Sequence, residues 1–168
     1  VPIAGLVSRG TGTSVNVQSL DNGVRQQVKE IVTHWKMQSG KTGKKESILS
    51  LVSSLEGEGK TFLTGALGIN RSESGDKVLL IDTDILSFAL GTVLNVPSGE
   101  NPMPETVEQA RNQITTTNIP NLSYLKVSSS RNWDLDKFSS VLRELQKQYS
   151  AIIIDTPSIC KSRFGAQI

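Results

Sequence analysis

The chain has 168 residues and a mass of 18.2 kDa, a length typical of one domain with a substantial buried core. Hydrophobic residues make up 36% of it and charged residues 20%. These fractions exclude a disordered protein, and no run approaches the roughly 20 apolar residues of a membrane-spanning helix. The formal net charge of +2 is too balanced to indicate a nucleic-acid partner. The single cysteine, Cys160, excludes an internal disulfide and suits a reducing compartment.

Residues 1–20 are expected to form an N-terminal arm and a linker. Residues 1–7 are apolar and contain a proline, as in an edge strand or a docked arm, and residues 9–19 are rich in Gly, Ser and Thr. The main domain is expected to occupy residues 21–168. Because the first residue is Val and not Met, we interpret the chain as a fragment of a longer protein.

From residue 21 onward, hydrophobic spacing predicts one helix and then strands that alternate with helices. The first helix, over 22–37, has one apolar face, formed by Val24, Val28, Ile31 and Trp35. A polar, basic loop is predicted over 39–45, and the Gly-Lys-Thr at 40–42 is interpreted as part of it because no strand precedes it. Further helices are predicted over 60–70, 104–114 and 136–148, and apolar strands over 48–52, 77–81, 122–127 and 151–154. This order predicts an α/β fold, with a mainly parallel sheet and helices on both faces.

A glycine-rich segment from Ser54 to Thr61, SLEGEGKT, follows the first predicted strand and opens a helix. This is the context of a phosphate-binding loop. Gly57 and Gly59 would let backbone N–H groups point inward around phosphate oxygens. Lys60 would place its charge on the β- and γ-phosphates, and the Thr61 hydroxyl would bind Mg²⁺. The strict pattern has Gly where Ser54 stands, and the alternative is an ordinary glycine-rich turn with an exposed lysine.

Acidic residues end two further strands. Asp82 and Asp84 follow the strand over 77–81, and their carboxylates point the same way if the extended geometry continues. Beside a triphosphate they would hold Mg²⁺ through water and accept a proton from an attacking hydroxyl. The alternative for Asp84 is that it caps the following helix. Asp155 follows the strand over 151–154. P-loop nucleotidases have an acid that holds Mg²⁺ at the same place, after an apolar strand.

Ligands of open α/β sheets bind beyond the carboxyl ends of the strands. The three segments are therefore expected to form one site of a P-loop NTPase-like domain. Their sequences VSSLEGEGKT, VLLIDTDIL and IIIDTPS resemble those of the bacterial tyrosine kinases of capsule and exopolysaccharide synthesis, which are akin to the MinD/ParA ATPases. The resemblance covers most of the chain, up to about residue 159.

This resemblance implies a cytoplasmic domain at the inner face of the bacterial cell membrane, which uses MgATP to phosphorylate protein tyrosine. The implied partner is a membrane polysaccharide co-polymerase segment, fused or separate, and self-association is a further expectation. By position in the motifs, the resemblance implies that Lys60, Asp82 and Asp84 are catalytic. It implies that Thr61, Asp82 and Asp155 bind the metal. The residues expected to bind ATP or ADP are Ser54, Gly57, Glu58, Gly59, Lys60, Thr61 and Phe62.

The sequence also departs from the family pattern. Leu86 stands where the family has Arg, Glu56 replaces a proline of the loop, and no tyrosine cluster is present. A catalytically weak or inactive scaffold of the export complex is therefore one alternative. A MinD-like ATPase is another, although Leu55 occupies the position of the signature lysine of partition ATPases.

Overall fold

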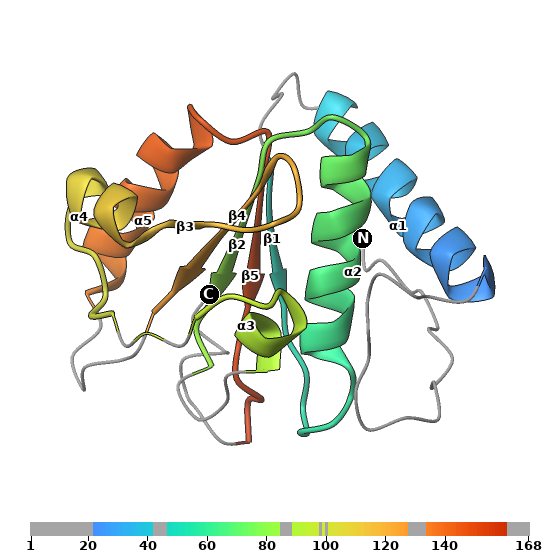
Figure 1. Cartoon of the computed structure of the whole chain (residues 1–168), viewed down its shortest axis with the longest axis horizontal. Coiled ribbons are helices and arrows are strands. Elements are labelled where there is room, and N and C mark those ends of the chain that lie inside the picture. The colour runs from blue at the N-terminus through green and yellow to red at the C-terminus, as the bar shows by residue number, and fades with distance from the viewer. Residues whose placement is uncertain are drawn as a thin grey trace.

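A five-stranded sheet forms the centre of the molecule (Figure 1). The computed structural model describes residues 22–41, 47–84, 89–97, 99, 101–127 and 134–160. The predicted arm and linker and Leu86 lie outside these ranges. The strands run in the order β1-β5-β2-β4-β3. Their bounds are β1 Ser47–Leu51, β2 Val78–Asp82, β3 Thr115–Thr116, β4 Leu122–Lys126 and β5 Ala151–Asp155.

The four longer strands are parallel, and only the two-residue β3 is antiparallel. Their register aligns one row of residues across the carboxyl edge of the sheet. Leu51 pairs with Asp155, Asp155 with Asp82, and Asp82 with Lys126. In a parallel sheet, paired residues extend to the same face. The last strand of the described chain thus brings its terminal acid between the first two strands.

Helices cover both faces of the sheet (Figure 1). The first face carries α1 (Asn22–Lys41), α2 (Lys60–Glu73) and the short α3 (Ala89–Val93), whereas α4 (Val107–Gln113) and α5 (Leu135–Gln146) lie on the second. The core is divided in the same way. Alternate strand residues such as Leu80 and Ile153 pack on the first face, and Ile81 and Ile154 pack on the second. The predicted α/β class, with a mainly parallel sheet and helices on both faces, is confirmed.

Local differences from the predicted elements have identifiable causes. α1 continues through Lys41. The prediction of a loop that begins at residue 39 and includes the Gly-Lys-Thr at 40–42 is therefore wrong for residues 39–41. No proline interrupts the helix there, so the backbone hydrogen bonds can continue. α4 begins at Val107 instead of residue 104, because Thr106 is extended and its side chain accepts a hydrogen bond from the Gln109 N–H as an N-cap. α3 and β3 had not been predicted.

In the part of the chain that the structure describes, none of the helices is both long and apolar enough to span a bilayer.

Candidate nucleotide-binding site

The loop between β1 and α2 has the backbone conformation of a phosphate-binding loop. Gly57 and Gly59 have φ values of 74° and 86°, in the left-handed region that favours glycine. A Cβ atom at either position would meet no atom within 4 Å. Conformation, and not crowding, therefore requires glycine at these two positions.

An acidic side chain already accepts a hydrogen bond from a backbone amide of this loop. The Leu55 N–H donates to Glu58 Oε2 at 3.1 Å, so a carboxylate oxygen lies where this amide can bind an anion. Lys60, the first residue of α2, donates from Nζ to Ser53 Oγ at 2.6 Å. Glu56, which stands where the family has proline, is exposed. Glu58 thus occupies the Leu55 amide, and Lys60 supplies the ammonium that a phosphate would contact.

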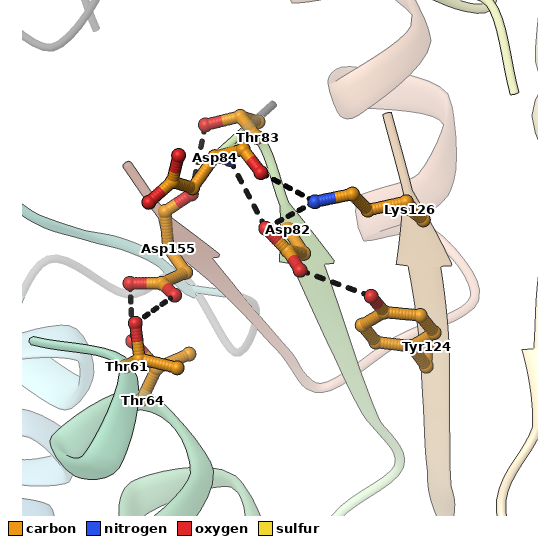
Figure 2. A network of polar contacts seen from close by, with 8 residues as sticks. All are labelled: Thr61, Thr64, Asp82, Thr83, Asp84, Tyr124, Lys126 and Asp155. Carbon is orange, nitrogen blue, oxygen red and sulfur yellow. Dashed lines mark hydrogen bonds and ion pairs between the residues drawn. The ribbon is translucent and has the colours of Figure 1, made fainter. Parts of the chain in front are cut away.

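The predicted metal residues Thr61 and Asp155 are in direct contact. Thr61 Oγ1 donates to Asp155 Oδ2 at 2.7 Å, and Thr64 Oγ1 donates to Asp155 Oδ1 at 3.3 Å (Figure 2). The hydroxyl of Thr61 lies at the first turn of α2, directly after the glycine loop. A hydroxyl and a carboxylate so placed fit Mg²⁺, which favours oxygen ligands and keeps several from water and phosphate.

Asp82 lies beside Asp155 and is held by three donors. Its Oδ1 is 3.0 Å from the Asp84 N–H and 3.1 Å from Lys126 Nζ, and its Oδ2 accepts from the Tyr124 hydroxyl at 3.0 Å. Figure 2 shows Lys126 and Tyr124 reaching Asp82 from the neighbouring strand β4. Asp82 and Asp155 are each 1% exposed. Hydrogen bonds therefore fix the orientation of this buried carboxylate.

Thr83 joins the two acidic strand ends. Its N–H and its Oγ1 both donate to the backbone carbonyl of Asp155, at 2.9 and 2.7 Å. Lys126 Nζ also donates to the backbone carbonyl of Asp84. The turn from Asp82 to Asp84 is thus tied to β5 on one side and to β4 on the other.

Burial dominates the acid–base properties of the site. Burial raises the pKa of Asp155 to about 6; the hydrogen bond from Thr61 lowers it, and the charge of Asp82 raises it further. Burial likewise raises the pKa of Asp82, although Lys126, Tyr124 and the Asp84 amide oppose the shift. The Tyr124 pKa is raised by burial and then by Asp82, so this hydroxyl stays a proton donor. A bound cation would favour the ionised form of both acids.

The structure brings Lys60, Thr61, Asp82 and Asp155 to one edge of the sheet, and Asp84 follows at the same strand end. Elsewhere in the predicted nucleotide set, Ser54, Gly57, Glu58 and Gly59 are exposed loop residues. The side chain of Phe62 packs against the core between the sheet and α1 and α2. The roles assigned to these residues stay predictions, including that of Asp84 as a helix cap.

Sequence reasoning missed Ser53, Thr64, Tyr124 and Lys126, which contact the predicted site residues. One signal existed for the last two. Tyr124 and Lys126 stand at i and i+2 at the end of an apolar strand, so they extend to one face. Only the strand order shows that this face is beside Asp82. Within the described ranges, no cluster of three or more His, Cys, Asp or Glu side chains could hold a metal.

No known protein-family profile matches the chain, but individual proteins do. The tyrosine-protein kinase CpsD of Streptococcus agalactiae is 29% identical over 133 residues, which covers 70% of this chain and 55% of CpsD. The septum site-determining protein MinD of Helicobacter pylori is 28% identical over 125 residues, covering 70% of this chain and 47% of MinD. The chain thus spans about half the length of the curated relatives it matches.

Solved structures give the same two groups of proteins. The VpsO kinase domain has a TM-score of 0.60 at 25% identity and covers 84% of this chain and 74% of its own. MinD from Pyrococcus horikoshii OT3, complexed with Mg-ADP, has a TM-score of 0.52 at 28% identity, covering 67% and 49%. The chimerical protein CapA2B2 has a TM-score of 0.76 and covers 98% and 74%, but at 20% identity it shows the fold alone.

Fold and site together define a P-loop NTPase-like domain with a mainly parallel sheet. Its homologues are bacterial tyrosine kinases and, as a weaker relation, MinD-type P-loop ATPases. The predicted resemblance is confirmed.

Proposed function

We propose that this chain is the cytoplasmic ATP-binding domain of a bacterial tyrosine autokinase that regulates capsular or exopolysaccharide synthesis and export. The observation that carries the proposal is the contact of Thr61 with Asp155, beside Lys60 and the glycine loop. Residues 94 positions apart meet in the arrangement that a magnesium nucleotide requires. The similarity to the tyrosine-protein kinase CpsD supports protein tyrosine as the acceptor.

Each residue of the site has a role in this proposal. The loop amides and Lys60 bind the phosphates of ATP or ADP, and Thr61, Asp82 and Asp155 hold Mg²⁺. When bound, Mg²⁺ would neutralise charge that develops on the transferred phosphoryl group. The acids at the end of β2 accept or orient the proton of the attacking tyrosine hydroxyl. Asp84 is the half-buried member of this pair, and Asp82 the fully buried one.

We further propose that the domain works at the inner face of the cell membrane, with a membrane polysaccharide co-polymerase segment, fused or separate, as its partner. This proposal follows from the resemblance of the three sequence motifs to the tyrosine kinases of capsule and exopolysaccharide synthesis. Self-association belongs to the same proposal.

Calorimetry with ADP and Mg²⁺ tests the nucleotide site. Lys60→Met is expected to weaken ADP binding about tenfold or more, because it removes the ammonium from the phosphate loop. Lys147→Met is the matched control, since Lys147 is exposed and pairs only with the nearby Glu144 in the contacts described. Equal ADP affinity for the wild type and Lys60→Met would contradict the proposal.

The kinase reaction needs a separate experiment with the full-length protein. Incubation with γ-labelled ATP and Mg²⁺ is expected to label tyrosine in the wild type, and Lys60→Met is expected to remove the label. ADP binding without any phosphotyrosine would overturn the kinase assignment. Absence of ADP binding would leave a scaffold of the export complex.

A MinD-like ATPase is the second candidate, favoured by the match to Helicobacter pylori MinD. Leu55, which stands where partition ATPases have a lysine, is 59% exposed in the loop. ATP hydrolysis without tyrosine labelling, together with ATP-dependent dimers in light scattering, would favour this candidate.

A further inference from the structure

We propose that Lys126 is a positioning residue of the nucleotide site. Its ammonium occupies the place that a metal ion would take beside Asp82, so that Mg²⁺ binds to Thr61 and Asp155 and not to Asp82. This inference rests on the proposed nucleotide binding, and it narrows the set of residues that reach Mg²⁺. It concerns a residue that no sequence motif of the site contains.

Geometry is the first support. Lys126 ends β4, and the sheet register places it directly beside Asp82. Its Nζ lies 3.1 Å from Asp82 Oδ1 and also donates to the backbone carbonyl of Asp84. The ammonium therefore bridges the two ends of the turn from Asp82 to Asp84. Figure 2 shows Lys126 approaching Asp82 from the side opposite Asp155.

Charge and burial are the second support. The side chains of Lys126 and Asp82 are 8% and 1% exposed. Asp155, almost fully buried, lies in the next strand on the other side of Asp82. Two adjacent buried carboxylates without a cation would repel each other strongly at low dielectric. Lys126 forms an ion pair with Asp82, whereas Asp155 feels the charge of Lys60 without a described ion pair and remains able to attract a metal.

The bonds of Asp82 explain why the metal should prefer Asp155. Both oxygens of Asp82 already accept hydrogen bonds, from Lys126, Tyr124 and the Asp84 amide. The hydrogen bonds to Asp155 described here come from hydroxyls, namely Thr61 and Thr64. A hydroxyl oxygen can turn its lone pairs to a metal, whereas an ammonium has none. The Thr61–Asp155 side can thus open to Mg²⁺ without loss of a cation.

Magnesium titrations monitored by thermal unfolding, without nucleotide, test the inference directly. In Lys126→Met the two acids lose their internal cation, so Mg²⁺ is expected to bind on the order of five- to tenfold more tightly than in the wild type. Lys126→Arg keeps the charge and is expected to respond like the wild type. An unchanged response in a folded Lys126→Met variant would overturn the proposal.

The double variant Asp82→Asn/Lys126→Met identifies the acid and keeps the test decisive if the single variant fails to fold. Removing both charges means that neither member of the Asp82–Lys126 pair is left as a buried ion without its partner. If the role of Lys126 is to neutralise Asp82, and Asp82 does not bind the metal, ADP binding by the double variant is expected to depend on Mg²⁺ as in the wild type. Calorimetry measures this dependence. Loss of that dependence would mean that Asp82 itself holds the metal, which overturns the proposal.

These readouts separate this inference from the proposed function. If the wild type binds no ADP, the nucleotide site fails, and the proposal on Lys126 is then decided by the titration with Mg²⁺ alone. A gain of Mg²⁺ affinity in Lys126→Met would uphold it, and no gain would end it.

Discussion

Asp155 is the residue at which burial and function conflict most clearly. It is almost fully buried, which raises its pKa to about 6 from an ordinary value of 3.8. An ionised Asp155 is what a metal requires, so the metal-free protein carries a destabilising charge at neutral pH. Sites for cations commonly contain such acids, and the bound ion offsets the cost.

The pH dependence of stability has a definite sign. Between about pH 4 and pH 6 the folded state holds a proton on Asp155 that the unfolded chain has released, so stability falls as the pH rises through this window. A pKa of about 6 corresponds to a loss of about 1 kcal/mol between pH 5 and pH 8.

Asp155→Asn is expected to remove that loss, since an amide does not ionise. Urea unfolding at pH 5 and pH 8, without magnesium, measures the difference in free energy of unfolding. Asp82 has a raised pKa as well and contributes in both proteins, so only the difference between them is diagnostic. If the free energy of unfolding changed equally with pH in the variant and the wild type, the raised pKa of Asp155 would be contradicted.

At the scale of elements, α1 is fixed to α2 by a mixed apolar and ionic contact. The guanidinium of Arg71, on α2, lies 4.3 Å from the centre of the buried Trp35 ring on α1. Asp76, beyond the end of α2, accepts from Arg71 Nε at 2.9 Å and pairs with Lys36 of α1 at 2.8 Å. These contacts join the first predicted helix to the helix of the phosphate loop.

Arg71 and Lys36 offer a matched comparison, because both pair with Asp76 but differ in burial. Their side chains are 4% and 37% exposed. Arg71→Met is expected to lower the free energy of unfolding by about 1–3 kcal/mol, as it removes a buried cation from both Trp35 and Asp76. Lys36→Met should cost less than about 1 kcal/mol. Urea unfolding of the two variants compares them, and an equal cost for both would refute the assigned role of Arg71.

At the scale of the whole molecule, the sheet separates two cores. Ile152 and Ile153 are neighbours in β5 and are both fully buried, but Ile152 packs toward α4 and α5, and Ile153 toward α1 and α2. This alternation was readable in the sequence only as a continuous apolar run, AIII. Such a run predicts a strand covered on both faces, without saying which helices cover each face.

Ile152→Val and Ile153→Val test this separation. Each is expected to lower the free energy of unfolding by about 0.5–1.5 kcal/mol through the loss of a buried methyl group. Because the two side chains lie in different cores, the double variant should show the sum within about 0.5 kcal/mol. Chemical denaturation of the three variants measures this, and a coupling above about 1 kcal/mol would show that the two side chains share packing partners.

Much of the site could be predicted because its signals are local. The glycines at 57 and 59 follow from the left-handed backbone of the loop, and Lys60 and Thr61 follow from the start of α2. Asp82 and Asp155 end apolar strands. The start of α4 was misplaced because it depends on one capping residue, Thr106, whose extended conformation the hydrophobic pattern does not show.

By itself, therefore, the sequence determined that an α/β domain carries a phosphate-binding loop and two strand-terminal acids, since periodicity and glycine-rich turns are properties of short segments. Only the tertiary structure decided that β5 lies between β1 and β2 and that β4 lies beside β2. Strand order depends on packing between residues far apart in the chain. The hydrophobic pattern of a short segment carries no information about such packing. That order places Asp155 against Thr61 and gives the buried Asp82 its own cation, Lys126.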